Sequence, residues 1–108
     1  MLIVIGSIEA RPETIDRIVE LGLEHVRRSR MEPGCLLHSI HRDVENELRV
    51  VFIERWEDAA ALQVHFQVLA SGEFVREAVD LAVRPPEISI YEAEVATMPN
   101  PAPEKRGG

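Results

Sequence analysis

The spacing of hydrophobic residues changes several times along this chain, and each change predicts where one secondary-structure element ends and another begins. Residues 2–10 (LIVIGSIEA) are largely apolar and rich in β-branched side chains, which predicts an opening strand buried on both faces. From Pro12 to about residue 30 the spacing is helical, which predicts one buried stripe of Ile15, Ile18, Val19, Gly22 and Val26. Pro33-Gly34 ends this helix and turns the chain.

The middle of the chain predicts a β-hairpin. Residues 35–43 and 48–56 are each rich in apolar and β-branched residues, and a short polar segment with Asn46 separates them. Side chains on a strand alternate between its two faces. The covered face is therefore predicted to carry Leu36, His38, Ile40, Val50, Phe52, Glu54 and Trp56. The opposite face carries Cys35, Leu37, Ser39, His41, Val51 and Ile53.

The last part of the chain predicts helices and a final strand. We expect Asp58 to cap a helix over 58–69, which Ser71-Gly72 interrupts before a further helical segment over 73–83. Residues 87–95 alternate again and predict a strand. Three prolines, two terminal glycines and few apolar residues follow. We therefore predict one domain over 1–96 and a disordered tail over 97–108.

The order of these elements predicts an α+β protein with the ferredoxin-like β-α-β-β-α-β arrangement. Its antiparallel four-stranded sheet would carry helices on one face. The other face also looks apolar, because Cys35, Leu37, Val51 and Ile53 are assigned to it. An uncovered apolar face is an interaction surface. We therefore predict a homodimer that pairs through the open sheet faces.

Composition and charge narrow the classes of partner. A formal charge of −7, from 19 acidic and 12 basic residues, argues against nucleic acid, which requires a basic surface. No apolar run approaches the roughly 18–20 residues that span a bilayer. The first five residues lack the basic start and long apolar stretch of a signal peptide. We therefore expect a cytoplasmic protein with no membrane partner. The single cysteine, Cys35, excludes an internal disulfide and is expected to be a small buried hydrophobe.

The covered sheet face gathers the groups that could carry chemistry. His38, Glu54 and Trp56 lie on it, and His65 from the covering helix is expected to point into the same layer. An apolar layer with a few titratable groups is typical of a small-molecule site. Structural roles are the alternative. In that interpretation His65 holds the helix to the sheet, Trp56 fills the core, and Glu54 bonds near Trp56 or pairs with an arginine. His25 is expected to be exposed beside the arginines of its helix.

Motifs for the common cofactors are absent. The sequence contains no GxGxxG, no phosphate-binding loop and no GxSxG. His38 and His41 are three residues apart on a strand, which places them on opposite faces and prevents joint binding of one metal ion. We therefore predict neither a cofactor nor a metal site.

Two segments resemble the antibiotic biosynthesis monooxygenase family of dimeric α+β barrels over about residues 1–95. The first is the set Glu54, Trp56, Asp58, Ala61, Leu62 and His65. The second is Glu32-Pro33-Gly34-Cys35-Leu36, which runs into His41-Arg42-Asp43. The resemblance implies oxidation of a quinol or polycyclic phenol by molecular oxygen without a cofactor. It implies His65, Trp56 and Glu54 as catalytic residues, with the substrate held by His38, Phe52, Phe66 and Phe74.

Other functions within this superfamily stay open. Gly6-Ser7 stands where the haem-degrading branch has an asparagine, which argues against haem degradation. The alternatives are a non-catalytic small-molecule-binding or stress-response dimer, and an isomerase or decarboxylase that uses His65 as its base. A well-lined pocket around Trp56 and His65 would favour an enzyme. A cleft filled by Phe66, Phe74 and Leu62 would favour a binding or structural role.

Overall fold

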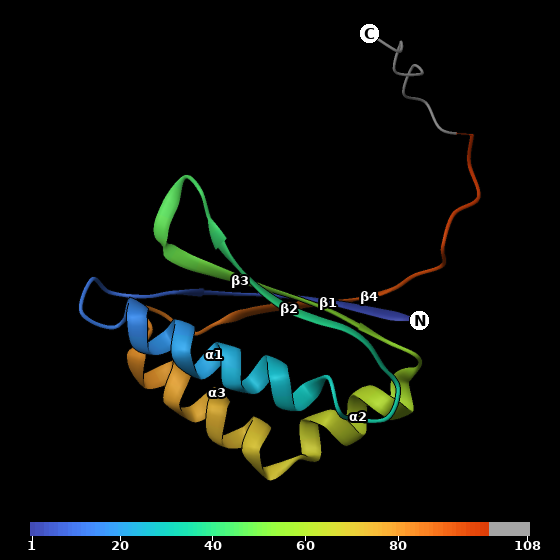
Figure 1. Ribbon diagram of the computed structural model, residues 1–108, viewed down its shortest axis with the longest axis horizontal. Coiled ribbons are helices and arrows are strands. Elements are labelled where there is room, and N and C mark those ends of the chain that lie inside the picture. Colours follow the sequence, from blue (N-terminus) through green and yellow to red (C-terminus); the bar gives the residue numbers. More distant parts are fainter. Residues whose placement is uncertain (100–108) are drawn as a thin grey trace, which may run out of the picture.

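The computed structural model describes residues 1–99, which form two layers, a sheet and the helices that cover one of its faces (Figure 1). The elements are β1 (Leu2–Glu9), α1 (Ile15–Ser29), β2 (Cys35–Asp43), β3 (Asn46–Trp56), α2 (Ala59–Gln67), α3 (Leu69–Leu81) and β4 (Glu87–Glu92). The strands pair antiparallel in the order β2-β3-β1-β4. This confirms the α+β, ferredoxin-like fold, with the second helical stretch divided into α2 and α3.

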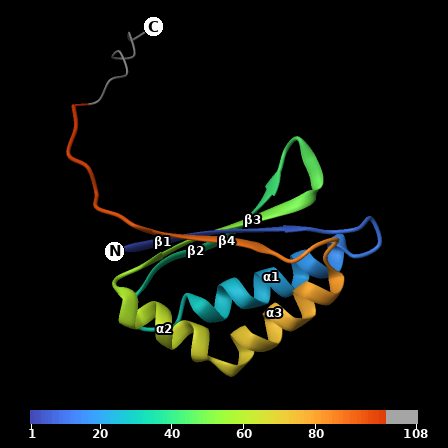
Figure 2. The same ribbon diagram turned by 180° about the vertical axis from the view of Figure 1, so that it is seen from behind.

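The view from behind shows the same two layers, with α1, α2 and α3 all on one side of the sheet (Figure 2). Within the described residues, no helix is both long and apolar enough to cross a membrane. The tail predicted from residue 97 lies almost wholly outside the described residues. The last strand ends at Glu92, three residues before the predicted end.

The alternation of β3 assigns its side chains to the two faces of the sheet. Phe52, Glu54 and Trp56 are buried on the helix side, whereas Val51 and Ile53 are only half-buried on the other. The open face also carries Ile5, Leu37 and Tyr91, whose side chains are 42%, 37% and 52% exposed. The prediction that β1 is buried on both faces is therefore wrong for the single chain. The predicted open apolar face is present.

The core lies between α1, α3 and the sheet, and Gly22 sets how closely α1 approaches. Its buried members include Ile8, Ile18, Val26, Val50, Phe52 and Ala78. A Cβ at position 22 would lie 2.5 Å from Cδ1 of Ile40 and 3.0 Å from Cζ of Phe52. These distances are shorter than van der Waals contact, so the sheet side chains occupy the space that a larger residue would need. Gly22 therefore lets the helix pack directly on β2 and β3.

A bulge in β2 changes two of the predicted orientations. Cys35 pairs with Trp56 and Leu37 pairs with Arg55, so Leu36 is an extra residue on this strand. Leu36 is consequently 51% exposed rather than buried with His38. Cys35 packs against Trp56 on the helix side instead of lying on the open face. Simple alternation was wrong here because it assumes an uninterrupted register.

Two helix boundaries also differ from the prediction. The break between the last two helices lies at Val68, whose backbone is extended (φ −65°, ψ 124°), and not at Ser71-Gly72. The N–H groups of Ser71 and Gly72 donate to the carbonyl of Val68, so both residues belong to the first turn of α3. Helix α1 begins at Ile15, because the preceding residues form a turn in which the Thr14 hydroxyl accepts from the N–H of Arg11.

Candidate functional site

A mostly apolar pocket lies between the sheet and the helices that cover it. Its volume is about 130 Å³. Phe52, Phe74, Val4 and Ile8 line its interior, and Phe66, Val75 and Ile88, each about half exposed, lie toward its mouth. The polar residues of its lining are His25, Glu54, His65 and Ser71, together with Ser7 and Glu87, whose strand positions direct their side chains to the other face of the sheet.

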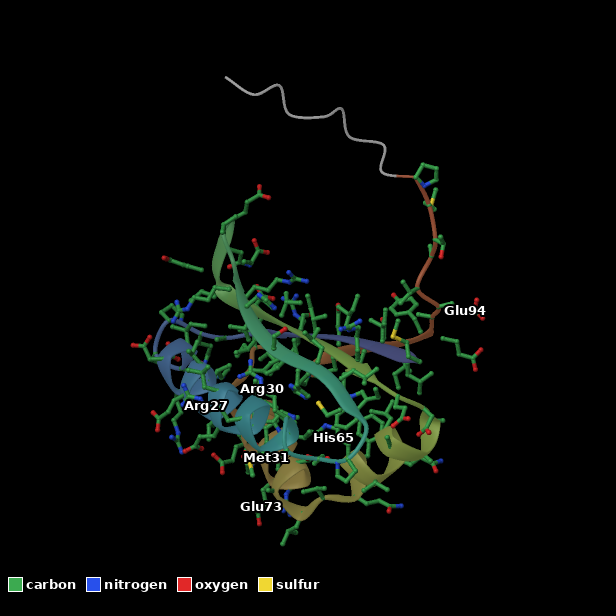
Figure 3. All side chains as sticks on the ribbon, turned by 45° about the vertical axis from the view of Figure 1, so that its right-hand side comes forward. Arg27, Arg30, Met31, His65, Glu73 and Glu94 are labelled. Atoms are coloured by element: carbon green, nitrogen blue, oxygen red, sulfur yellow. The ribbon has the colours of Figure 1, made fainter. Side chains whose placement is uncertain are left out.

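The N-terminal turn of α2 fixes the position of His65. The Asp58 carboxylate accepts from the N–H of Ala61 at 2.8 Å, which confirms Asp58 as the helix cap. Gly34, at φ 80°, brings the preceding turn against this helix start, and its carbonyl accepts from the N–H of Glu57 at 2.8 Å. His65 then points from α2 into the layer between the helices and the sheet and is 3% exposed (Figure 3).

Glu32, from the turn between α1 and β2, holds the His65 ring. Its Oε1 and Oε2 lie 3.0 and 3.2 Å from His65 Nδ1. A carboxylate only accepts hydrogen bonds, so Nδ1 carries the proton in this pair. In neutral His65, Nε2 is then the nitrogen with a free lone pair. This arrangement of a carboxylate and an imidazole is the one that general bases use.

Glu54 forms the second polar centre of the layer. Its Oε1 accepts from Trp56 Nε1 at 2.9 Å and lies 3.3 Å from His38 Nε2 and 3.8 Å from His65 Nε2. Burial opposes ionisation of Glu54, but the neighbouring His38 and the Trp56 hydrogen bond outweigh burial and lower the pKa of this carboxyl. Glu54 is therefore a buried carboxylate that faces imidazole rings.

His25 is buried, and the expectation that it is exposed was wrong. It is 5% exposed and stacks on Phe74 with ring centroids 4.3 Å apart and an interplanar angle of 9°. Burial, reinforced by the neighbouring His38 and His65, lowers the pKa of His25 from 6.5 to about 3. The ring is therefore neutral near physiological pH.

The residues proposed from the sequence divide into two groups in the structure. His65, Glu54, Phe52, Phe66 and Phe74 line the pocket. His38 and Trp56 are 1% and 0% exposed and are not among the lining residues. Trp56 lies behind His65, with ring centroids 4.5 Å apart. Trp56 therefore supports the pocket wall from behind, through its contact with His65 and its hydrogen bond to Glu54.

Sequence reasoning missed two residues of this site. His25 follows Ile18 by seven residues and Gly22 by three, so the helical spacing of the apolar stripe already placed it on the buried face. Its neighbouring arginines concealed that signal. Glu32 had no comparable signal, because its contact with His65 joins residues 33 positions apart through a loop.

Three of the four histidines converge in this layer. One ring nitrogen from each of His25, His38 and His65 lies within 4.8 Å of the others. His41 is exposed on the other side of β2, where its Nε2 lies 2.8 Å from the Ser39 hydroxyl. The expected separation of His38 and His41 is thus confirmed, but His38 joins two histidines from other elements.

This fold and pocket define a small ferredoxin-like domain that carries an apolar pocket between its helices and sheet. The family model for antibiotic biosynthesis monooxygenase matches residues 1–77. The chain therefore belongs to the antibiotic biosynthesis monooxygenase family, as its sequence resemblance implied.

Individual relatives agree with this assignment. An uncharacterized protein of Synechocystis sp. is 36% identical over 98 residues, which cover 90% of this chain and 67% of that protein. A crystal structure described as an antibiotic biosynthesis monooxygenase has 30% identity and a TM-score of 0.81, covering 88% of this chain and all of that one. A Deinococcus radiodurans structure assigned to the same class has 24% identity and a TM-score of 0.87, covering 93% and 99%, and it supports the fold alone.

Proposed function

We propose that this protein is a monooxygenase that oxidises a quinol or polycyclic phenol with molecular oxygen and without a cofactor. The observation that carries this proposal is the Glu32–His65 pair, which presents a buried imidazole in the wall of an apolar pocket. The lining Phe52, Phe66 and Phe74 suit a flat aromatic substrate. Phe66 and Phe74 stand in the pocket wall and leave it open, which favours an enzyme over a filled structural core.

The proposed reaction begins with proton transfer. His65 Nε2 takes the proton of the substrate hydroxyl, while the Glu32 carboxylate stabilises the resulting imidazolium through Nδ1–H. The phenolate then donates an electron to oxygen, and the two radicals combine at a ring carbon to give a peroxide anion, which takes the proton back from His65 and becomes a hydroperoxide. Loss of water leaves a carbonyl, so the substrate supplies all four electrons and one oxygen atom leaves as water. The apolar wall excludes solvent from the intermediates.

The remaining buried groups would position His65. Glu54 Oε1 lies 3.8 Å from His65 Nε2, and Trp56 packs on the imidazole from behind. His38 contacts Glu54 and completes this support. In this proposal Glu54 also favours the protonated form of His65 after proton transfer, because its negative charge is held in the same buried layer.

We further propose that the protein works as a homodimer through the open sheet face. Ile5, Leu37 and Tyr91 expose apolar surface there, and Val51 and Ile53 extend the patch across the central strands. Burial of such a patch against a second copy would stabilise a chain of only 108 residues.

Oxygen uptake by chelator-treated protein, supplied with a panel of hydroquinones and naphthols, tests the enzymatic proposal. We expect uptake above the spontaneous rate, and a fall in kcat of about 10²- to 10⁴-fold in His65→Gln. His41→Gln is the matched control, because His41 is exposed on the open sheet face outside the pocket, and it should keep full activity in a variant that sedimentation shows to associate as the wild type does. Equal turnover by folded His65→Gln would refute the role of His65. No uptake with any compound would favour the isomerase or the binding dimer.

A further inference from the structure

Three imidazoles from three different elements meet in the buried layer. His25 comes from α1, His38 from β2 and His65 from α2, and they are 5%, 1% and 3% exposed. Their ring centroids lie 5.1, 5.3 and 5.6 Å apart. One nitrogen of each ring lies within 4.8 Å of one nitrogen of the other two. Figure 3 shows the position of His65, the member of this cluster that also binds Glu32.

The cluster contains polar atoms without partners. Within the described part of the chain, Nδ1 of His25 and both ring nitrogens of His38 are buried and make no hydrogen bond. Nε2 of His38 does lie 3.3 Å from Glu54 Oε1, which is close enough for an ion pair, although it makes no hydrogen bond. Buried polar atoms in native proteins almost always have a partner. Three such atoms on two adjacent rings indicate that the cluster binds something.

We infer that His25, His38 and His65 form a binding site for one divalent transition-metal ion. Neutral imidazole is the ligand that Zn²⁺, Co²⁺, Ni²⁺ and Cu²⁺ share, and three histidines with one open position form a recurrent metal site. Glu54 supplies a buried negative charge, with Oε1 3.3 Å from His38 Nε2 and 3.8 Å from His65 Nε2. The Glu54 carboxylate therefore balances part of the positive charge of a cation bound in this layer.

Glu32 has the position of an outer carboxylate in such a site. Metal-binding histidines almost always donate their second N–H to a carboxylate or carbonyl, which orients the ring toward the ion. Glu32 accepts from His65 Nδ1 at 3.0 Å, so Nε2 is directed to the cluster. The pocket provides a path to the ion, because His25, Glu54 and His65 all line it.

Metal binding requires the three rings to draw together. Metal–nitrogen bonds of 2.0–2.1 Å in a tetrahedral site place the ligand nitrogens roughly 3.3 Å apart. The present limit of 4.8 Å therefore has to shrink by up to about 1.5 Å. Side-chain torsions of His25 and His65 can supply this movement, since both rings border the open pocket.

Bound metal has a predictable effect on the oxidation, and this part alone rests on the proposed function. The ion would occupy His65 Nε2, the atom proposed to take the proton from the substrate. Stoichiometric Zn²⁺ is therefore expected to inhibit oxygen uptake, and a chelator is expected to restore it.

Metal binding is tested directly with untagged, chelator-treated protein. Titration with Co²⁺, followed by its visible spectrum, should give one ion per chain. Cu²⁺ bound to the wild type should show coupling to three imidazole nitrogens by electron paramagnetic resonance, a readout that needs no variant. Absence of Co²⁺ binding, or a Cu²⁺ spectrum without imidazole nitrogens, would overturn the inference.

Variants assign the ligands. His25→Gln and His38→Gln should each weaken Co²⁺ binding by at least about 100-fold, and Glu32→Gln by about 10-fold. His41→Gln is the matched control and should bind as the wild type does. Circular dichroism checks that each variant is folded. If neither His25→Gln nor His38→Gln folds, the Cu²⁺ spectrum of the wild type decides whether the three imidazoles bind the ion. Equal Co²⁺ affinity in folded His25→Gln, His38→Gln and His41→Gln would exclude the site.

The two proposals fail in different ways. Oxygen uptake in chelator without any Co²⁺ binding would overturn the metal site and leave the oxidation intact. Co²⁺ binding without uptake in chelator would support the metal site and contradict oxidation without a cofactor. If uptake occurs only with added metal, the site stands and the ion is a cofactor.

Discussion

The two faces of the sheet each depart locally from the usual distribution of polarity. The layer between the helices and the sheet buries a carboxylate and three imidazoles. The face without helices exposes Ile5, Leu37 and Tyr91. Both faces are built by the same strands, and β3 alone directs Glu54 to one side and Ile53 to the other. Polar groups are normally placed toward water, so each face must be explained by something other than the stability of the single chain.

The comparison assigns a different role to each face, a chemical site to the covered face and an interaction surface to the open face. Burial of Glu54 and the histidines costs free energy of solvation, which is offset only where hydrogen bonds such as those of Glu32 and Trp56 are made. Exposure of apolar residues costs free energy until another surface covers them. The covered face is therefore the place to look for chemistry, and the open face the place to look for a partner.

Removal of the indole at the centre of the covered face should have the largest effect. Trp56 is fully buried and donates to Glu54. We expect Trp56→Ala to lower the free energy of unfolding by about 3–5 kcal/mol, from lost packing and an unpaired carboxylate. Urea denaturation measures this change. Tyr91→Ala on the open face should cost less, and its effect should depend on protein concentration. Equal, concentration-independent losses would contradict the comparison.

A charge on the open face should break the proposed dimer. We expect Ile53→Glu to weaken self-association by about 3 kcal/mol, because two carboxylates would face each other across a symmetric interface. Sedimentation equilibrium measures the dissociation constant. Val64→Glu is the matched control, since Val64 is 54% exposed on α2 and should not disturb the sheet face. A dimer of Ile53→Glu as tight as that of the control would assign the interface elsewhere.

Acid should destabilise the covered face through His25. Its pKa is lowered to about 3 by burial, so the folded chain holds it neutral, whereas the unfolded chain binds a proton below about 6.5. The contribution of neutral His25 to the free energy of unfolding is therefore complete above pH 6.5 and is lost as the pH falls toward 3. Between pH 6.5 and 5 the free energy of unfolding should fall by about 2 kcal/mol.

Urea unfolding of metal-free protein from pH 7.5 to 5 measures the slope. The free energy of unfolding of His25→Gln should depend less steeply on pH than that of the wild type. His41→Gln should retain the wild-type slope, because His41 is exposed. An unchanged slope in His25→Gln would show that other groups account for the acid sensitivity.

The smallest effect concerns the helix that presents His65. Asp58 caps α2 through the N–H of Ala61. We expect Asp58→Ala to lower the free energy of unfolding by about 1 kcal/mol, whereas Asp58→Asn should retain most of the cap. Thermal denaturation of both variants measures the difference. Equal stability of the alanine and asparagine variants would mean that the side-chain cap contributes little.

Particular residues show which features could be predicted from the sequence and which could not. The cap at Asp58, the hairpin of β2 and β3, and the burial of His38, Glu54, Trp56 and His65 all followed from spacing and residue type. The positions of Leu36 and Cys35 did not, because a single bulge residue reverses the side to which its neighbours point. The break at Val68 was also missed, because an isolated glycine such as Gly72 is tolerated inside a helix and here did not end one.

The sequence by itself determined the order of the elements, the family, and which positions of β3 face the helices, since these depend on periodicity and local preference. Only the tertiary structure decided that Glu32 binds His65 and that His25 joins His38. It also placed Trp56 behind the pocket wall. Such contacts join residues far apart in the chain, and their distances depend on how closely α1 and α2 approach the sheet. That approach is set by packing at positions such as Gly22, which no local pattern records.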